Sequence, residues 1–393
     1  MATYDFAAVT PKMITKVLTH FRENAFATLF SFSDMKNEAR SRGEVLTIPV
    51  PVLPEVKQVV AGRANVAASN ASNQRFENAL VPLDQWWEVE LEFTDRQLTE
   101  IEDSAVQRQL EGAGIALANH VNTACLRALA LGSSNLANEP GTSIPSDPDV
   151  GTEVDRILAE HNVPDGVGDR VVAVRPKVYQ KLLNHDDLRH LQNSGAPGVL
   201  RMAKLPDFAD MSWFRSNKLY KHTAGTLTST TLTSPTSTVL AGVKSFTGAN
   251  QLVGTGIAGT LLKGDHFRIA NLDETFVVTD NAIVTATTVN VSFEPPLPAD
   301  VPASQAITVI LVSGFRNVAW HRDTLVFAPR PMGVGTIRVE GRNVREIIDP
   351  VSGIPMRVEL TAINKAIQIR FDLLYGVGIS RSIGGVVILD TAV

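Results

Sequence analysis

The chain has 393 residues, which is long for one simple core and favours two or three domains. Its charged fraction of 20%, hydrophobic fraction of 44% and net charge of -5 are ordinary for a soluble globular protein and argue against a dedicated nucleic-acid binder. The single Cys125 excludes an internal disulfide and a cysteine-based zinc site, and no apolar run approaches the roughly 20 residues that span a bilayer. The first twelve residues lack the features of a secretory signal, so we expect a chain made in a cytoplasm.

The first predicted element is a helix over residues 11–33. Pro11 suits the first helical position, and apolar residues recur at steps of three and four, which gives one apolar stripe. Such a helix either packs on its own domain or forms an arm that docks on a neighbouring molecule. The stripe consists of Met13, Ile14, Val17, Leu18, Phe21, Ala25, Leu29 and Phe32.

Residues 44–52 and 86–93 alternate like strands, and the polar segment between them, 55–82, is too long for an ordinary hairpin turn. We expect a two-stranded excursion from the body, with a surface loop as the alternative. Three charged residues of this region are candidates for ion pairs with a neighbouring chain: Arg63, Arg75 and Glu77.

Trp86 and Trp87 are adjacent in the second of these strands, so their side chains point to opposite faces. Both are buried only if both faces of the strand are covered. The alternative is that one faces the body of the subunit and the other a neighbour.

A long helix is predicted from Asp95 to Leu131, where no proline intervenes. The turn-rich segment 132–151 then forms a boundary. After it, the patterns predict a helix over 152–162, a buried strand over 170–175 and a helix over 176–184 that opens with proline. This is a small α/β grouping.

The composition changes over residues 224–313. Threonine occurs 17 times between residues 223 and 313, Trp and Tyr are absent, and short strand-like runs alternate with turns, which indicates a small all-β barrel or sandwich. We expect its core to contain Phe246, Phe267, Phe276 and Phe293, and the segment to fold by itself. Six acids against three bases favour a polar contact with a basic partner, through Asp265, Asp273, Glu274 and Asp280.

No motif indicates catalysis, a cofactor or a metal. Residues 254–259 match G-x-G-x-x-G, but the turn at 263–265 leaves no room for the helix that would hold a pyrophosphate. The histidines of HDDLRH (185–190) are five residues apart and diverge on a helix. His321-Arg322-Asp323 has no nucleophile beside it, and Cys125 is expected in the core. An oxidoreductase that uses the glycine motif is therefore the least favoured alternative.

The last sixty residues contain three strand-like runs, MRVEL, IQIRF and VVILD, separated by turns. Four charged residues within or directly after these runs predict one buried and one polar or partner-facing side: Arg357, Glu359, Arg370 and Asp372. In the glycine-dense run 375–385, Gly376, Gly378, Gly384 and Gly385 allow positive φ and close backbone approach. No helix that could bind phosphate follows, so this run is predicted to be a building element.

The segments DPVSGIPMRVEL (349–360) and RFDLLYGVGISRSIGGVVIL (370–389) resemble the end of tailed-bacteriophage major capsid proteins with the Hong Kong 97-type fold, closest to the podophage coat family with an inserted domain. Residues 207–226 are similar to the segment before that insert. The resemblance implies an α+β fold with an N-terminal arm (1–42), an E-loop (43–94), a peripheral domain with a spine helix (95–150), an axial domain (151–223), an inserted β domain (224–313) and a return through both domains (314–393).

The same resemblance implies a non-enzymatic protein that assembles into hexamers and pentamers of an icosahedral shell. Such a shell encloses double-stranded DNA without reading its sequence, is built in the host cytoplasm with scaffolding and portal proteins, and forms the virion. No cofactor and no membrane are implied. An encapsulin-type nanocompartment is the alternative within this fold, although such shells usually lack a threonine-rich insert.

Overall fold

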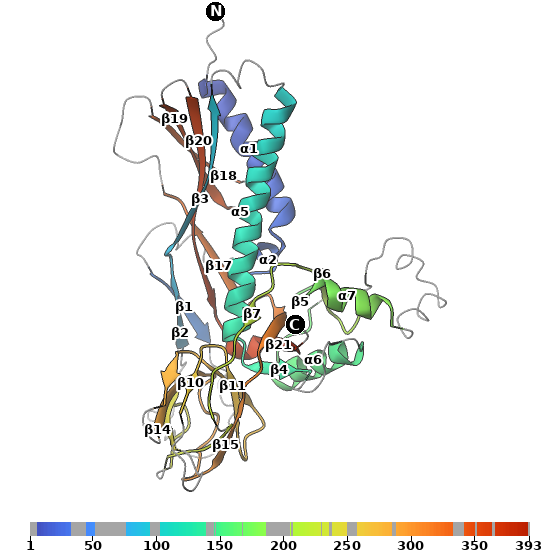
Figure 1. The fold of residues 1–393 in the computed structure, drawn as a ribbon, viewed down its shortest axis with the longest axis vertical. Coiled ribbons are helices and arrows are strands. Elements are labelled where there is room, and N and C mark those ends of the chain that lie inside the picture. Colours follow the sequence, from blue (N-terminus) through green and yellow to red (C-terminus); the bar gives the residue numbers. More distant parts are fainter. Residues whose placement is uncertain are drawn as a thin grey trace, which may run out of the picture.

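The longest helix of the computed structural model, α5 (Asp103–Gly132), connects a β-sheet at one end of the molecule to a barrel at the other (Figure 1). Its sequence has no proline and many alanines, which suits an uninterrupted helix. The structure describes residues 6–32, 45–51, 76–94, 103–138, 145, 147–166, 168–185, 205, 207–228, 230–235, 238–249, 258–284, 288–332, 342–349, 352–363 and 366–391.

A five-stranded antiparallel sheet lies along the first part of α5. Its strands are β3 (Gln85–Thr94), β17 (Leu325–Arg330), β18 (Arg342–Ile348), β19 (Pro355–Ile363) and β20 (Ala366–Ile379). The order is β17-β20-β19-β18, with β3 paired along the other side of β20. The predicted strands 86–93, 356–360 and 367–371 are therefore confirmed, and β20 continues through Gly376 and Gly378.

Helix α1 (Phe6–Asn24) packs beside α5 on one face of this sheet (Figure 1). Ile14, Val17 and Phe21 have no exposed surface and belong to the same core as Phe371 and Tyr375 of β20. The apolar stripe predicted from the sequence thus contacts the helix's own subunit.

The predicted helix over 11–33 is interrupted at Ala25, and a short helix, α2 (Phe26–Leu29), follows. Asn122 of α5 explains the break: its amide group donates to Asn24 O at 2.8 Å, and its carbonyl oxygen accepts from Ala27 N at 3.2 Å. One buried asparagine therefore satisfies backbone groups that the continuous helix would have paired internally.

The other face of the five-stranded sheet carries the predicted polar residues, and they are paired with one another. Arg357 and Asp372 form an ion pair across β19 and β20, and Arg370 lies 3.5 Å from Glu90 of β3. Asp372 and Glu359 are buried. The polar side predicted for these strands thus exists, and much of its charge is neutralised within the chain.

A second sheet contains six strands in the order β4-β21-β16-β5-β6, with β7 paired to β16. One face meets the α5 core, and the other is covered by α6 (Asp149–Glu160) and α7 (Pro176–Leu183). The prediction of helix, strand and helix between residues 152 and 184 is confirmed. The strands are β4 (Asn135–Ala137), β5 (Arg170–Val174), β6 (Ser212–Arg215), β7 (Lys221–His222), β16 (Gly314–His321) and β21 (Gly385–Asp390).

The threonine-rich segment forms a closed barrel in the strand order β11-β12-β14-β9-β8-β15 (Figure 1). Its core contains Phe267, Phe276 and Phe293, as predicted, whereas the side chain of Phe246 lies outside the described residues. The barrel strands are β8 (Thr231–Thr233), β9 (Ser245–Ala249), β11 (His266–Ile269), β12 (Thr275–Val278), β14 (Thr288–Glu294) and β15 (Ala306–Ile310), and β10 (Thr260–Leu261) pairs separately with β13 (Ala282–Ile283).

The barrel begins and ends at neighbouring strands of the six-stranded sheet. β7, which precedes it, pairs with β16, which follows it, through His222 with Gly314 and Lys221 with Phe315. Both ends of the barrel segment therefore lie side by side, a geometry that tolerates an added unit.

Two glycines of α5 give a first prediction. A Cβ added at Gly114 would lie 2.6 Å from the backbone oxygen of Val17 in α1, whereas one added at Gly112 would meet nothing within 4 Å. We expect Gly114→Ala to lower the free energy of unfolding by about 1–3 kcal/mol because the helices must separate. Gly112→Ala should raise it by about 0.5–1 kcal/mol through helix propensity. Chemical denaturation of both variants measures the difference, and equal effects would contradict the proposed close approach.

Candidate functional site

A two-stranded ribbon sits on the five-stranded sheet and is held there by two glycines. β1 (Val45–Pro51) and β2 (Phe76–Pro82) pair antiparallel with each other. A Cβ at Gly376 would lie 2.5 Å from Pro82 O, and one at Gly378 would lie 2.5 Å from Val81 Cγ2. Both glycines are thus needed for close approach, as predicted, but neither adopts positive φ.

The ribbon differs in one respect from the sequence prediction. The sequence predicts that strand 86–93 flanks the excursion on its far side, but this strand belongs to the five-stranded sheet. β1 pairs instead with residues 76–82, which lie within the predicted polar segment. Leu80 and Val81 alternate between the two faces of β2, and this period-2 signal is too short to stand out from the polar stretch before it.

The two faces of the ribbon are both apolar, but only one is covered. Leu46, Ile48 and Val81 pack on Val326 and Ala328 of β17. On the opposite face, Val45 and Leu80 are 48% and 65% exposed. Arg63 and Arg75 lie outside the described residues, as does the side chain of Glu77, whose backbone pairs with Val50.

Trp86 and Trp87 point to opposite faces of β3, as the strand geometry requires, and both remain largely exposed, at 60% and 47%. Trp87 contacts His120 of α5 with ring centroids 4.2 Å apart, and Trp86 lies against the Arg357 guanidinium. The prediction of a covered central strand with both side chains buried is wrong: β3 is an edge strand among the described strands, and neither face covers its tryptophan completely. Exposed tryptophans are frequent in protein interfaces.

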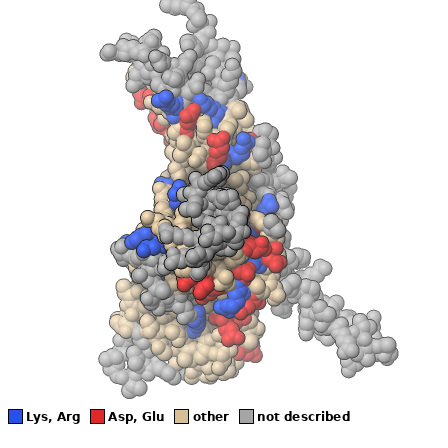
Figure 2. Space-filling model, turned by 90° about the vertical axis from the view of Figure 1, so that its right-hand side faces the viewer, with Lys and Arg blue, Asp and Glu red and all other residues tan. Residues whose placement is uncertain are grey.

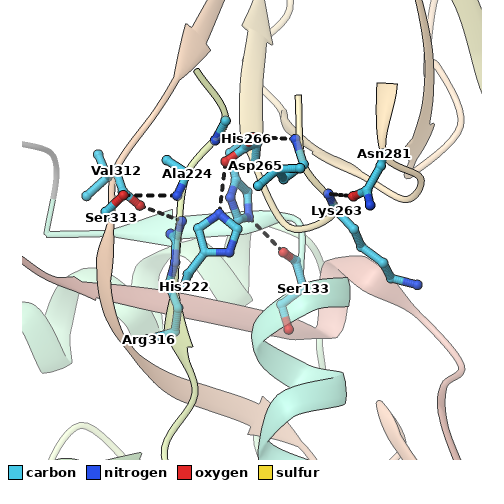
Figure 3. Close-up of polar contacts among 12 residues, drawn as sticks. Ser133, His222, Ala224, Lys263, Asp265, His266, Asn281, Val312, Ser313 and Arg316 are labelled. Carbon is cyan, nitrogen blue, oxygen red and sulfur yellow. Dashed lines mark hydrogen bonds and ion pairs between the residues drawn. The ribbon is translucent and has the colours of Figure 1, made fainter. Parts of the chain in front are cut away.

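The barrel joins the rest of the subunit through a buried polar cluster, shown in Figure 3. The Asp265 carboxylate lies 2.9 Å from His222 Nε2 of β7 and accepts hydrogen bonds from the backbone nitrogens of Gly225 and Leu262. Asp265 and His222 are almost completely buried. The expectation that Asp265 meets a basic partner on the surface is therefore wrong: this carboxylate fastens the barrel to its own sheet.

His266 makes the second link of this joint. Its Nε2 lies 2.9 Å from the carbonyl oxygen of Ser133, directly after α5 (Figure 3). Burial, reinforced by the positive charge of Arg316, lowers the pKa of His266 to about 3. Burial likewise lowers the pKa of Arg316 to about 10. His266 is thus neutral at physiological pH and donates its Nε2 proton to Ser133 O.

The other acidic candidates of the barrel lie at its surface. Asp273 and Asp280 are exposed and Glu274 is half-buried, so their carboxylates are accessible in the subunit. Whether they bind a basic partner stays a prediction.

The described residues contain no grouping that resembles a catalytic or metal centre. No cluster of three His, Cys, Asp or Glu side chains suited to a metal is found there. Within the glycine motif, of which 254–257 lie outside the described residues, Gly259 leads into strand β10 and not into a helix. His321 and Asp323 form a polar turn at the end of β16, and Cys125 is buried, which raises the pKa of its thiol to about 12. Residues 186–190 are outside the described part.

No helix among the described residues is sufficiently long and apolar to cross a bilayer.

Comparisons with known proteins find neither a matching family model nor a matching curated protein. Among solved structures, the chain is similar to one from Mycobacterium phage Che8, with 16% identity, a TM-score of 0.48 and coverage of 93% of this chain and 90% of that one. A capsid structure of cyanophage P-SCSP1u matches with 12% identity, a TM-score of 0.47 and coverage of 88% and 84%. The mature capsid of bacteriophage PhiM1 matches with 11% identity, a TM-score of 0.44 and coverage of 89% and 83%. These values are too low to assign a family.

The close approach of the ribbon to Gly376 and Gly378 gives a second prediction. Gly378→Ala should lower the free energy of unfolding by about 1–3 kcal/mol because its methyl group overlaps Val81. Val81→Ala in the same chain removes the overlapping atoms, so the double variant should be more stable than the sum of the single changes indicates. Denaturation and amide exchange of 45–51 and 76–82 measure this coupling. Additive effects would contradict direct contact.

The buried imidazole gives a third prediction. Because the pKa of His266 is about 3 in the folded state and ordinary, near 6.5, in the unfolded state, only the unfolded state binds this proton between those values. Stability from this group is complete above pH 6.5 and falls by about 1.4 kcal/mol per pH unit on acidification toward pH 3. His266→Gln, whose amide can still donate to Ser133 O, should reduce the slope of unfolding free energy against pH by one proton. An unchanged slope would show that His266 is protonated in the fold.

Proposed function

We propose that this chain is the major capsid protein of a tailed double-stranded-DNA phage, with the Hong Kong 97-type fold, and that it assembles into hexamers and pentamers of an icosahedral shell. In this proposal the β1–β2 ribbon is the E-loop, α5 the spine helix, the six-stranded sheet with α6 and α7 the axial domain, and the barrel an inserted domain that folds by itself. The shell is built in the host cytoplasm with scaffolding and portal proteins and becomes the virion.

The observation that carries this proposal is the ribbon with two apolar faces. Its inner face packs closely on β20 at Gly376 and Gly378, so the ribbon is held in a defined direction. Val45 and Leu80 remain exposed on the outer face. Isolated two-stranded ribbons are marginally stable in water, and an exposed apolar face is stabilised by burial against another molecule. Many identical subunits can each supply that cover for the next one.

The exposed Trp86 and Trp87 on β3 and the accessible acids on the barrel supply further contact surfaces. We infer that the barrel acids Asp273, Glu274 and Asp280 contact basic side chains of other subunits, and that DNA is held by enclosure without sequence-specific binding. An encapsulin-type compartment would use the same kind of contacts. The barrel favours the phage capsid, since such compartments usually lack an insert of this kind.

The experiment replaces the exposed face of the ribbon. Val45→Glu with Leu80→Glu should leave the subunit folded, because substitutions at exposed positions usually change stability by less than about 0.5 kcal/mol. Negative-stain microscopy should show closed shells for the wild type and none for the charged variant. Leu80→Ile keeps the face apolar and serves as the control that still assembles. The absence of shells from the wild-type protein, or normal shells from the charged variant, would contradict the proposal.

A further inference from the structure

The layer formed by the six-stranded sheet, α6 and α7 is electrically polarised. Both helices pack on the same face of the sheet, since Val154 and Leu158 of α6 and Val178 and Leu182 of α7 share one core. α6 lies against β4 and β21, and α7 follows directly from β5, near the edge strand β6. The two helices therefore lie over neighbouring parts of this face, and α6 reaches as far as β5 and β6 through Asp155, which pairs with Arg170, and Gly151, which approaches Trp213. We call the surroundings of α6 the α6 end and those of α7 the α7 end, and the two carry opposite charge.

The α6 end is acidic. Between residues 147 and 170 the chain has seven acids and two bases, and one of the bases, Arg170, is buried against Asp155 and the carbonyl oxygens of Val163 and Pro164. Arg156 is paired with Glu160. The acids are Asp147, Asp149, Glu153, Asp155, Glu160, Asp165 and Asp169.

The α7 end is basic. In residues 175–185 and 207–221 the chain has six bases and two acids. Arg175 and Lys221 both lie near the Phe315 ring, so these two cations occur close together, and Arg215 lies over the Tyr179 ring of α7. The bases are Arg175, Lys177, Lys181, Arg215, Lys218 and Lys221. Figure 2 shows that acidic and basic side chains both reach the surface on this side of the molecule.

Two ion pairs between described residues cross this layer, Arg170 of β5 with Asp155 of α6 and Arg175 with the buried Asp390 of β21, and neither uses the exposed lysines of α7. Lys177, Lys181 and Asp165 are exposed to solvent in the single subunit, and Glu160 is exposed beside its partner Arg156. Each end is thus complementary to the other end of a second copy. A contact between two different surfaces of identical chains is head-to-tail, and repetition of such a contact closes a ring when the rotation between subunits allows it.

We infer that the acidic α6 end of one subunit docks on the basic α7 and β6 end of the next subunit around a ring. This inference rests on the proposed shell function and names the contact that orders subunits within one ring. The occupant of the basic end is therefore a second copy of this chain, and not a nucleic acid. Electrostatic contacts of this kind contribute mainly to orientation and to rejection of wrong pairings. Because the charges are exposed, the contact should weaken as salt concentration rises.

Charge reversal tests the contact. The α7 variant carries Lys177→Glu and Lys181→Glu, and the α6 variant carries Glu160→Lys and Asp165→Lys. Each places like charges against each other across the ring contact, and we expect each to reduce the yield of shells by more than about tenfold, which corresponds to about 1.4 kcal/mol. The fourfold variant restores complementarity with reversed sign and should assemble within about twofold of the wild type. Thermal melting of each variant checks that the subunits remain folded, and microscopy with sedimentation measures the shells.

Three other outcomes would contradict either the proposed capsid function or the inferred ring contact. Wild-type protein without shells contradicts the proposed function. Wild-type shells, with a folded fourfold variant that assembles no better than the α7 variant, overturn the inference about the ring contact. In the third outcome, the α6 variant forms normal shells, whereas the α7 and fourfold variants form none and also lose binding to duplex DNA. The basic end would then bind nucleic acid, and the inference about the ring contact would likewise be overturned.

Discussion

The packing of α5 is the constraint on which the rest of the subunit depends. Along its length the helix contacts α1 and one face of the five-stranded sheet, and its residues Leu126 and Leu129 are completely buried. At its end, β4 enters the six-stranded sheet within a few residues, and Ser133 O receives the bond from His266 of the barrel. Both sheets and the barrel are thereby positioned by one rigid element, so a change in the helix would be transmitted to all three.

The joint of the barrel shows how polar burial can specify an orientation. Desolvating Asp265, His222, His266 and Arg316 together is costly unless each finds partners in fixed places. The Asp265 carboxylate meets this condition with His222 and two backbone N–H groups, which come from both sides of the joint. An apolar contact of the same size would permit many orientations of the barrel relative to the sheet. These hydrogen bonds are all formed in only one orientation. The cluster therefore contributes to the definition of one arrangement more than to net stability.

The sequence was informative wherever a local pattern determined the structure. The strands at 86–93, 356–360 and 367–371, the helices over 152–162 and 176–184 and three phenylalanines of the barrel core follow from periodicity and composition. Side chains of these elements meet their neighbours in a regular order. What the sequence could not provide was set by contacts between distant residues. Asn122 interrupts a helix about a hundred positions away, and Asp265 is buried only because β7 and α5 meet the barrel there. The close approach at Gly376 and Gly378 was expected, but its partner, the β1–β2 ribbon, lies nearly 300 residues earlier in the chain.

The placement of charge accounts for a composition that is unremarkable as a whole. A net charge of -5 over 393 residues suggests no partner, yet acids prevail around α6 and bases around α7 and β6. In contrast, the polar face of the five-stranded sheet alternates its charges and neutralises them within the chain, as Arg357 with Asp372 and Arg370 with Glu90 show. A neutralised face has little to offer a charged partner, whereas a polarised layer has two complementary faces and one preferred direction. A subunit built in this way can combine a non-directional apolar contact, through the ribbon, with a directional charged contact, through the six-stranded sheet. In the proposed shell the apolar contact would supply most of the free energy of association, and the charged contact would distinguish the correct neighbour from an inverted one.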